Sequence, residues 1–174
     1  SGPRTMIGHA TWEGRTIQPG EHVFLEMAGC VRRYHTAMMR TVLLDEKSAA
    51  MQSAEATMIE ALEAAHELIR PGLMVTDLDK CVRDIICHND VGAKLITRVG
   101  YSIGIAFAPS WDEGYIMSLK QGDETVLRPG MTFHLIPWMW GVDGDKTCGI
   151  SDTILVTEEG CESFFTLPKE MTVV

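Results

Sequence analysis

The chain has 174 residues, of which 45% are hydrophobic and 22% are charged, and its formal net charge is −9. This size suits a single domain over 1–174 with an apolar core of its own. The acidic balance and the lack of a Lys/Arg block argue against nucleic acid and anionic membranes as partners, and no apolar run reaches the roughly 20 residues of a membrane span.

The chain begins with SGPR rather than with methionine. We therefore expect its start to be an added segment, a cleavage site or a fragment boundary, and no signal peptide is recognisable. The five cysteines are odd in number and include no CxxC pair. This pattern predicts reduced thiols in a cytoplasmic protein rather than disulfides or a zinc site.

The first predicted element is a β-hairpin over 22–31 and 34–44, two segments rich in Val, Phe, Leu and Thr. The stretch GEHVFLEMAGCVRRYHTAMMRT, residues 20–41, contains the first strand and most of the second. It places Glu26 on the first strand, and Ala37 follows eleven residues later, shortly before Arg40-Thr41. Glu26 is therefore the sole carboxylate on either strand.

Two helices are predicted after the hairpin. From Ser48 the apolar residues recur at steps of three and four, which predicts an amphipathic helix ending at Pro71-Gly72. A second helix is predicted from Thr76 to His88, with Thr76 or Asp77 as its N-cap. The apolar face of the first helix contains Met51, Ala54, Met58, Leu62, Ala65 and Ile69.

After Gly92 the chain changes to short apolar runs separated by turn signals such as Arg128-Pro129-Gly130. These runs predict strands over 94–107, 115–119, 131–140 and 150–157. Strands, two central helices and further strands together predict an α+β fold, in which a curved antiparallel sheet has helices on one face.

The order of these motifs resembles the pita-bread family of peptidase M24, which includes creatinase, aminopeptidase P and methionine aminopeptidase. Besides the hairpin, the resemblance rests on LRPGM and on SDTILVTEEGCESFFTLPKEM, and it covers His9 to Val174. It implies one pita-bread catalytic-type domain. The helices and N-terminal domain that members usually carry before the first strand have no counterpart, so we expect a chain shortened at its N-terminus.

Within this family, the segments GHATWEGR, FLEMAGC, RYH, VGYSIGI and PGMTFHLIP are similar to the ectoine hydrolase branch. That resemblance implies a metal-independent hydrolase of a small cyclic amidine, with ectoine as the expected substrate and N-acetyl-diaminobutyrate as the product. It also implies a glutamate that attacks the amidine carbon and forms a covalent intermediate.

Family members hold metal ions with five side chains, and the resemblance places these positions at Glu26, Ala37, Tyr101, Ile136 and Ser151. Of these, only Glu26 has a carboxylate. Divalent ions of this class need several oxygen or imidazole donors that converge on one point. We therefore expect neither a metal ion nor another cofactor. A further catalytic histidine of the family corresponds to Ala108.

The catalytic residues that we expect are Glu26, His134 and Tyr101. A protonated amidine has an electrophilic carbon, and Glu26 is the predicted nucleophile. His134, or alternatively His35, is predicted to transfer protons near neutral pH. Tyr101 is predicted to donate a hydrogen bond to the tetrahedral intermediate or to the amidine nitrogen.

The substrate contacts that we expect are His9, His35, Trp138 and Asp152. By analogy with the family, His9 is predicted to contact the substrate carboxylate. Trp138 or Trp140 is predicted to stack on the amidinium through a cation–π contact.

These site residues also have structural alternatives. Glu26 is equally placed to pair with an arginine of the hairpin (Arg32, Arg33 or Arg40), and Asp152 to pair with Arg40 or to cap a turn. Regular alternation would point His35 away from the cavity.

Alternative functions are a creatinase-like enzyme with another guanidino or amidino substrate, a Xaa-Pro dipeptidase-like protein, or a catalytically silent domain that serves binding or dimerisation. The missing ligands argue against the peptidase. The expected partners are a small-molecule substrate and a second copy of the chain, in a homodimer.

Overall fold

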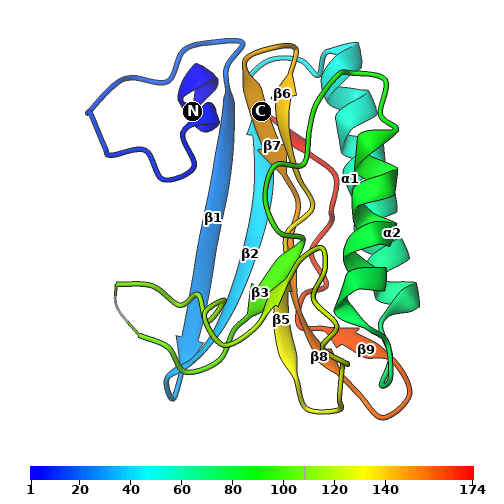
Figure 1. The fold of residues 1–174 in the computed structure, drawn as a ribbon. Helices are drawn as coiled ribbons and strands as arrows, with labels where there is room; N and C mark the ends of the chain where they lie inside the picture. Colours follow the sequence, from blue (N-terminus) through cyan, green and yellow to red (C-terminus); the bar gives the residue numbers. More distant parts are fainter. Residues whose placement is uncertain (108) are drawn as a thin grey trace.

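In the computed structural model, residues 1–107 and 109–174 are described, so Ala108 lies outside the described residues. Figure 1 shows the two helices side by side along one face of the sheets, while the N-terminal segment lies beside the first strand. The expected α+β arrangement is confirmed. No helix among the described residues is both long and apolar enough to cross a membrane.

The hairpin forms as predicted, from β1 (His22–Val31) and β2 (Tyr34–Leu43). Its register places Glu26 opposite Met39. At the turn Arg32 and Arg33 have φ angles of 51° and 73°, a left-handed conformation that reverses the chain within two residues. The short strand β10 (Thr172–Val173) pairs with β2 in parallel. The prediction of a wholly antiparallel sheet is therefore wrong at this strand.

The first helix, α1 (Ala49–Leu68), begins where the sequence predicts, because the side chain of Ser48 accepts a hydrogen bond from the backbone N–H of Met51. The second, α2 (Val75–Cys87), begins one residue earlier than predicted, and its N-cap Met74 offers no side-chain hydrogen bond. Thr76 instead accepts a hydrogen bond from the backbone of Gly122. All six residues predicted for the apolar face of α1 are buried: Met51, Ala54, Met58, Leu62, Ala65 and Ile69.

The second half of the chain forms shorter strands than predicted. The five-stranded sheet has the order β4-β3-β5-β8-β9, and β6 and β7 form a separate pair. These strands are β3 (Gly100–Ser102), β4 (Ser118–Leu119), β5 (Thr132–Leu135), β6 (Trp138–Val142), β7 (Lys146–Gly149), β8 (Asp152–Val156) and β9 (Cys161–Ser163).

Two long predicted strands are therefore wrong in extent. Of 94–107, only Gly100–Ser102 is a strand, and 131–140 is interrupted between β5 and β6. Pro137 lies at this interruption and has no N–H to donate to a neighbouring strand. The chain can therefore leave one sheet and enter another at this point.

A short bridge joins the hairpin to the five-stranded sheet. The backbone N–H of Met39 donates to the carbonyl of Ser151 over 3.4 Å, and that of Ser151 donates to the carbonyl of Met39 over 3.2 Å. This bridge brings β2 against β8. Since Glu26 lies opposite Met39, the bridge also fixes where Glu26 stands relative to β3 and β5.

Candidate active site

A cavity of about 370 Å³ lies where β1 and β2 meet β3 and the segments before and after it. Four of the predicted site residues line it, namely His9, Glu26, Tyr101 and Trp138. Ile136 and Met39 line it too, together with the loop residues Thr97, Arg98, Pro109, Ser110, Trp111 and Asp112. The hairpin and the family-motif turn at Tyr101 therefore converge on one space, as predicted.

Glu26 is half-buried in this cavity and has no hydrogen-bond or ion-pair partner in the part of the chain that the structure describes. The alternative in which it pairs with an arginine is wrong, because Arg40 pairs with Asp152, and Arg32 and Arg33 are exposed at the turn. Burial raises the pKa of Glu26, Asp112 raises it further, and His9 lowers it. An unpaired carboxylate facing an open cavity is free to engage a cationic ligand.

Apolar side chains surround Glu26 on the hairpin side. Met39, Tyr101 and Ile136 form a buried cluster, against which Phe24 and Trp111 pack. Two of the family's ligand positions, Tyr101 and Ile136, are thus part of a small hydrophobic core rather than a donor set.

The remaining positions do not fit a metal ion either. The backbone of Ala37 exchanges two hydrogen bonds with the hydroxyl of Thr153, at 2.9 Å and 2.8 Å. Ser151 is fully buried and its hydroxyl contacts His134. Over residues 1–107 and 109–174, no group of three or more His, Cys, Asp or Glu side chains is placed to hold a metal ion. The donor set therefore does not match the two-metal chemistry of the family.

Tyr101 and His134 face each other on adjacent strands, since they are register partners in β3 and β5. The hydroxyl of Tyr101 lies 2.8 Å from Nδ1 of His134 and accepts a hydrogen bond from Trp111 Nε1 over 3.2 Å. Burial and the nearby charge of Glu26 raise the pKa of Tyr101 well above its ordinary value. Tyr101 is therefore a protonated phenol at neutral pH.

His134 occupies a different place from the one predicted. His134 has no exposed surface and does not line the cavity, because Tyr101 lies between His134 and the cavity. Burial, together with the nearby charge of Arg98, lowers the pKa of His134 to about 3. An imidazole with so low a pKa does not match the predicted proton transfer near neutral pH, and its contact toward the cavity is the hydroxyl of Tyr101.

Arg98, Trp111 and Asp112 are cavity residues that the sequence analysis missed. The guanidinium of Arg98 lies 4.5 Å from the ring centroid of Tyr101 and forms an ion pair with Asp112. It also donates to the hydroxyl of Ser118 over 2.9 Å. No sequence signal marks these residues beyond their position on either side of the Tyr101 turn.

Trp138 lines the cavity and Trp140 packs against it. The two rings lie 4.7 Å apart between centroids, and Phe24 lies 5.2 Å from Trp138 on its other side. The segment with His9 packs against this pair, because a Cβ at Gly8 would lie 3.7 Å from both tryptophan rings. The aromatic pair therefore supports the segment that carries His9.

Two predicted substrate contacts lie outside the cavity. His35 shares the parity of Met39 on β2, but it stands four residues away, which is about 13 Å along a strand. It lines a separate cavity of about 250 Å³ near the hairpin turn. Distance along the strand, rather than alternation, therefore separates it from Glu26.

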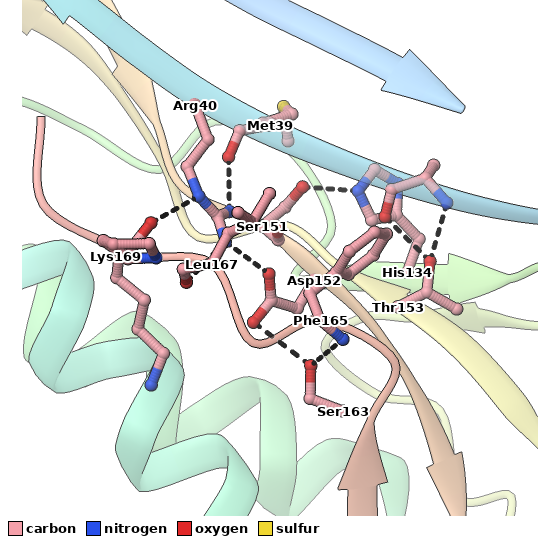
Figure 2. Close-up of polar contacts among 12 residues, drawn as sticks. Met39, Arg40, His134, Ser151, Asp152, Thr153, Ser163, Phe165, Leu167 and Lys169 are labelled. Atoms are coloured by element: carbon pink, nitrogen blue, oxygen red, sulfur yellow. Dashed lines mark hydrogen bonds and ion pairs between the residues drawn. The ribbon is translucent and has the colours of Figure 1, made fainter. Parts of the chain in front are cut away.

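Asp152 is buried in a polar cluster behind the sheet (Figure 2). It accepts hydrogen bonds from Arg40 over 3.0 Å and from the hydroxyl of Ser163 over 3.3 Å. Arg40 also donates to the carbonyls of Met39 and Ser151. Asp152 thus does not contact the cavity, and its pairing with Arg40 ties β2 to β8.

The chain matches the model of metallopeptidase family M24 over residues 1–158. The chain belongs to this family.

Among relatives in M24, it is 38% identical over 176 residues to ectoine hydrolase of Halomonas elongata, with 99% of this chain and 42% of the relative covered. It is 29% identical to the probable dipeptidase PepE of Mycobacterium tuberculosis, with 100% of this chain and 45% of that protein covered. The chain thus spans less than half the length of these relatives.

Solved M24 structures show the same fold. Dipeptidase PepE from Mycobacterium ulcerans superposes with a TM-score of 0.87 at 27% identity, over 99% of this chain and 45% of that one. The Xaa-Pro dipeptidase from Bacillus anthracis gives a TM-score of 0.84 at 27% identity, over 99% and 47%. The predicted pita-bread fold is confirmed, and the relatives are hydrolases.

Proposed function

We propose that this chain provides the catalytic site of a hydrolase that opens a small cyclic amidine without a metal ion, with ectoine as the substrate. The observation that carries the proposal is Glu26, which lines the cavity and has no partner among the described residues, while the other family ligand positions have apolar or hydroxyl side chains. A peptidase of this family needs two bridged metal ions, and these residues do not fit them. The similarity to ectoine hydrolase supports the choice of substrate.

An amidinium ion suits this cavity. Its positive charge is spread over N–C–N, so its central carbon is electrophilic and its charge attracts the carboxylate of Glu26. Attack by a Glu26 oxygen forms a C–O bond and moves an electron pair onto a ring nitrogen. Water then displaces the carboxylate, and one C–N bond breaks as its nitrogen takes a proton. The sum is amidine plus water giving an amide and an amine.

Other groups in the cavity suit the rest of such a substrate. Ectoine is zwitterionic, and Arg98 has N–H donors that match a carboxylate, while the ring of Trp138 offers a face to a cation. His9 is exposed and lines the cavity, and we assign to it a contact with the substrate carboxylate. The hydroxyl of Tyr101 can donate a hydrogen bond to the tetrahedral intermediate or to the amidine nitrogen, where charge changes during the reaction.

We also propose that the working protein is a cytoplasmic homodimer. All five cysteines are free, as expected of a protein kept in a reducing compartment. Light scattering on the purified protein would give its molar mass directly. A monomer at micromolar concentration would refute the dimer.

The test of the proposed function is turnover of ectoine after removal of metal ions with a chelator. The ring protons of ectoine are followed by NMR for the wild-type chain, for Glu26→Gln, and for the full protein encoded by the gene. The proposal predicts conversion to N-acetyl-diaminobutyrate by the wild type and none by Glu26→Gln.

The outcomes are distinct. Turnover by the full protein alone would mean that residues outside this chain complete the pocket. No turnover by either form would refute the proposal and favour a domain that serves binding or dimerisation. Turnover that stops after chelation would refute the metal-independent part.

A further inference from the structure

A chain of hydrogen bonds runs from the cavity into the sheet. Trp111 Nε1 lies 3.2 Å from the hydroxyl of Tyr101, that hydroxyl lies 2.8 Å from Nδ1 of His134, and Nε2 of His134 lies 2.5 Å from Oγ of Ser151. Figure 2 shows the inner end of this chain, where His134 and Ser151 meet below β2. Tyr101, His134 and Ser151 are buried, whereas Trp111 is partly exposed.

The protons in these three hydrogen bonds can be assigned by counting donors. Trp111 Nε1 can only donate, so it uses one lone pair of the Tyr101 oxygen. A neutral imidazole has one N–H and one bare nitrogen, so His134 donates at one end of its ring and accepts at the other. Two arrangements of the remaining protons are therefore possible.

In the first arrangement, the hydroxyl of Tyr101 donates to Nδ1, and Nε2–H of His134 donates to Ser151. The proton of Ser151 Oγ then needs an acceptor. Among residues 1–107 and 109–174, His134 is its sole hydrogen-bond partner, and Ser151 has no exposed surface. This arrangement leaves a buried O–H donor without an acceptor, which is costly.

In the second arrangement, Ser151 donates to Nε2 and Nδ1–H donates to the oxygen of Tyr101. The hydroxyl of Ser151 and the N–H of His134 then both have acceptors inside the protein. The oxygen of Tyr101 accepts from both Trp111 and His134, which leaves its own O–H unused by the protein. Tyr101 lines the cavity, so that O–H is available to a ligand there.

We propose that Ser151 and His134 are positioning residues that hold the imidazole with its proton on Nδ1, and thereby present the O–H of Tyr101 as a hydrogen-bond donor to the cavity. The ligand group that it fits is an acceptor, such as an oxyanion or a nitrogen with a free lone pair, bound beside Glu26. The catalytic use of this donor rests on the proposed amidine hydrolysis, whereas the proton arrangement does not.

The arrangement has a spectroscopic signature that requires no substrate. The protein labelled with ¹⁵N-histidine is measured by long-range ¹H–¹⁵N correlation, with His134→Gln used to assign the signals. The expected result is a pyrrole-like shift at Nδ1 and a pyridine-like shift at Nε2. Free histidine in water prefers its proton on Nε2, so this result would not arise by default. A pyrrole-like Nε2, or averaged shifts at the two nitrogens, would overturn the proposal.

Variants of Ser151 then test the cause. In Ser151→Ala the two nitrogen shifts are expected to move toward each other, because no buried hydroxyl favours either tautomer, and Ser151→Thr, which keeps the hydroxyl, restores the wild-type shifts. Unchanged shifts in a folded Ser151→Ala would show that Ser151 does not set the tautomer and would overturn this assignment. If ectoine is turned over, Ser151→Ala lowers kcat about tenfold, the value of one neutral hydrogen bond, with KM unchanged.

The two proposals fail separately. Absence of turnover with the predicted nitrogen shifts would refute amidine hydrolysis and leave the proton arrangement in place. Turnover of ectoine together with a pyrrole-like Nε2 would support amidine hydrolysis and refute the proton arrangement.

Discussion

Replacing Asp152 by alanine tests whether this residue is structural, as its contacts indicate, or part of the substrate site, as the sequence suggested. Its carboxylate and the guanidinium of Arg40 are 3% and 11% exposed and lie 3.0 Å apart. Removing one partner of a buried ion pair costs about 3–5 kcal/mol, because the other charge stays buried. Arg40 keeps its bonds to the carbonyls of Met39, Ser151 and Pro168, so we expect the lower end, about 3 kcal/mol.

For a domain of this length, each kcal/mol shifts the melting temperature by about 2–4 °C, so the expected decrease is about 6–12 °C. Urea unfolding followed by circular dichroism would give the free energy, and calorimetry the melting temperature. Asp84→Asn is the matched control, since Asp84 pairs with Lys80 on the open surface of α2, and such pairs contribute little. Its melting temperature should equal that of the wild type.

The kinetics of the same variant complete the test. If the protein turns over ectoine, Asp152→Ala assayed below its melting temperature should keep the wild-type KM, because Asp152 does not line the cavity. A loss of less than 1 kcal/mol together with a KM raised tenfold or more would refute the reasoning and return Asp152 to the substrate site.

Three further predictions concern the cavity. Burial raises the pKa of Glu26 above 4.5, so its ionised form destabilises the folded protein at pH 7. Glu26→Gln should therefore be at least as stable as the wild type at pH 7 in urea titrations, and this advantage should disappear below about pH 4, where Glu26 is neutral. A variant less stable than the wild type at pH 7 would show a hidden partner of Glu26. The acid limb of kcat/KM against pH, which reports the ligand-free enzyme, should have its midpoint above 4.5 for the same reason, and a midpoint below it would contradict Glu26 as nucleophile. Tyr101→Phe should lower kcat about 100-fold or more with a small change in KM, and an unchanged kcat would exclude its O–H from the reaction.

Much of this molecule was determined by local sequence. The hairpin and α1 follow from periodicity and from Ser48 as N-cap, features that span a few residues each. The family assignment followed from ordered motifs, and the loss of its ligand set was visible as Ala37, Ile136 and Ser151. Residue types at fixed spacings suffice for such inferences, because they do not depend on which segments meet in space.

Only the tertiary structure decided which side chains share the cavity. Arg98 and Asp112 come from loops without periodicity, and they share the cavity with Glu26 because the fold brings the Tyr101 turn to the hairpin. His134 has a sequence position suited to the site, yet its strand pairing with β3 puts Tyr101 between it and the cavity. Asp152 forms an ion pair with Arg40, which lies 112 positions away in the sequence. Contacts of this kind depend on strand register and packing over the whole chain, which a local pattern does not encode.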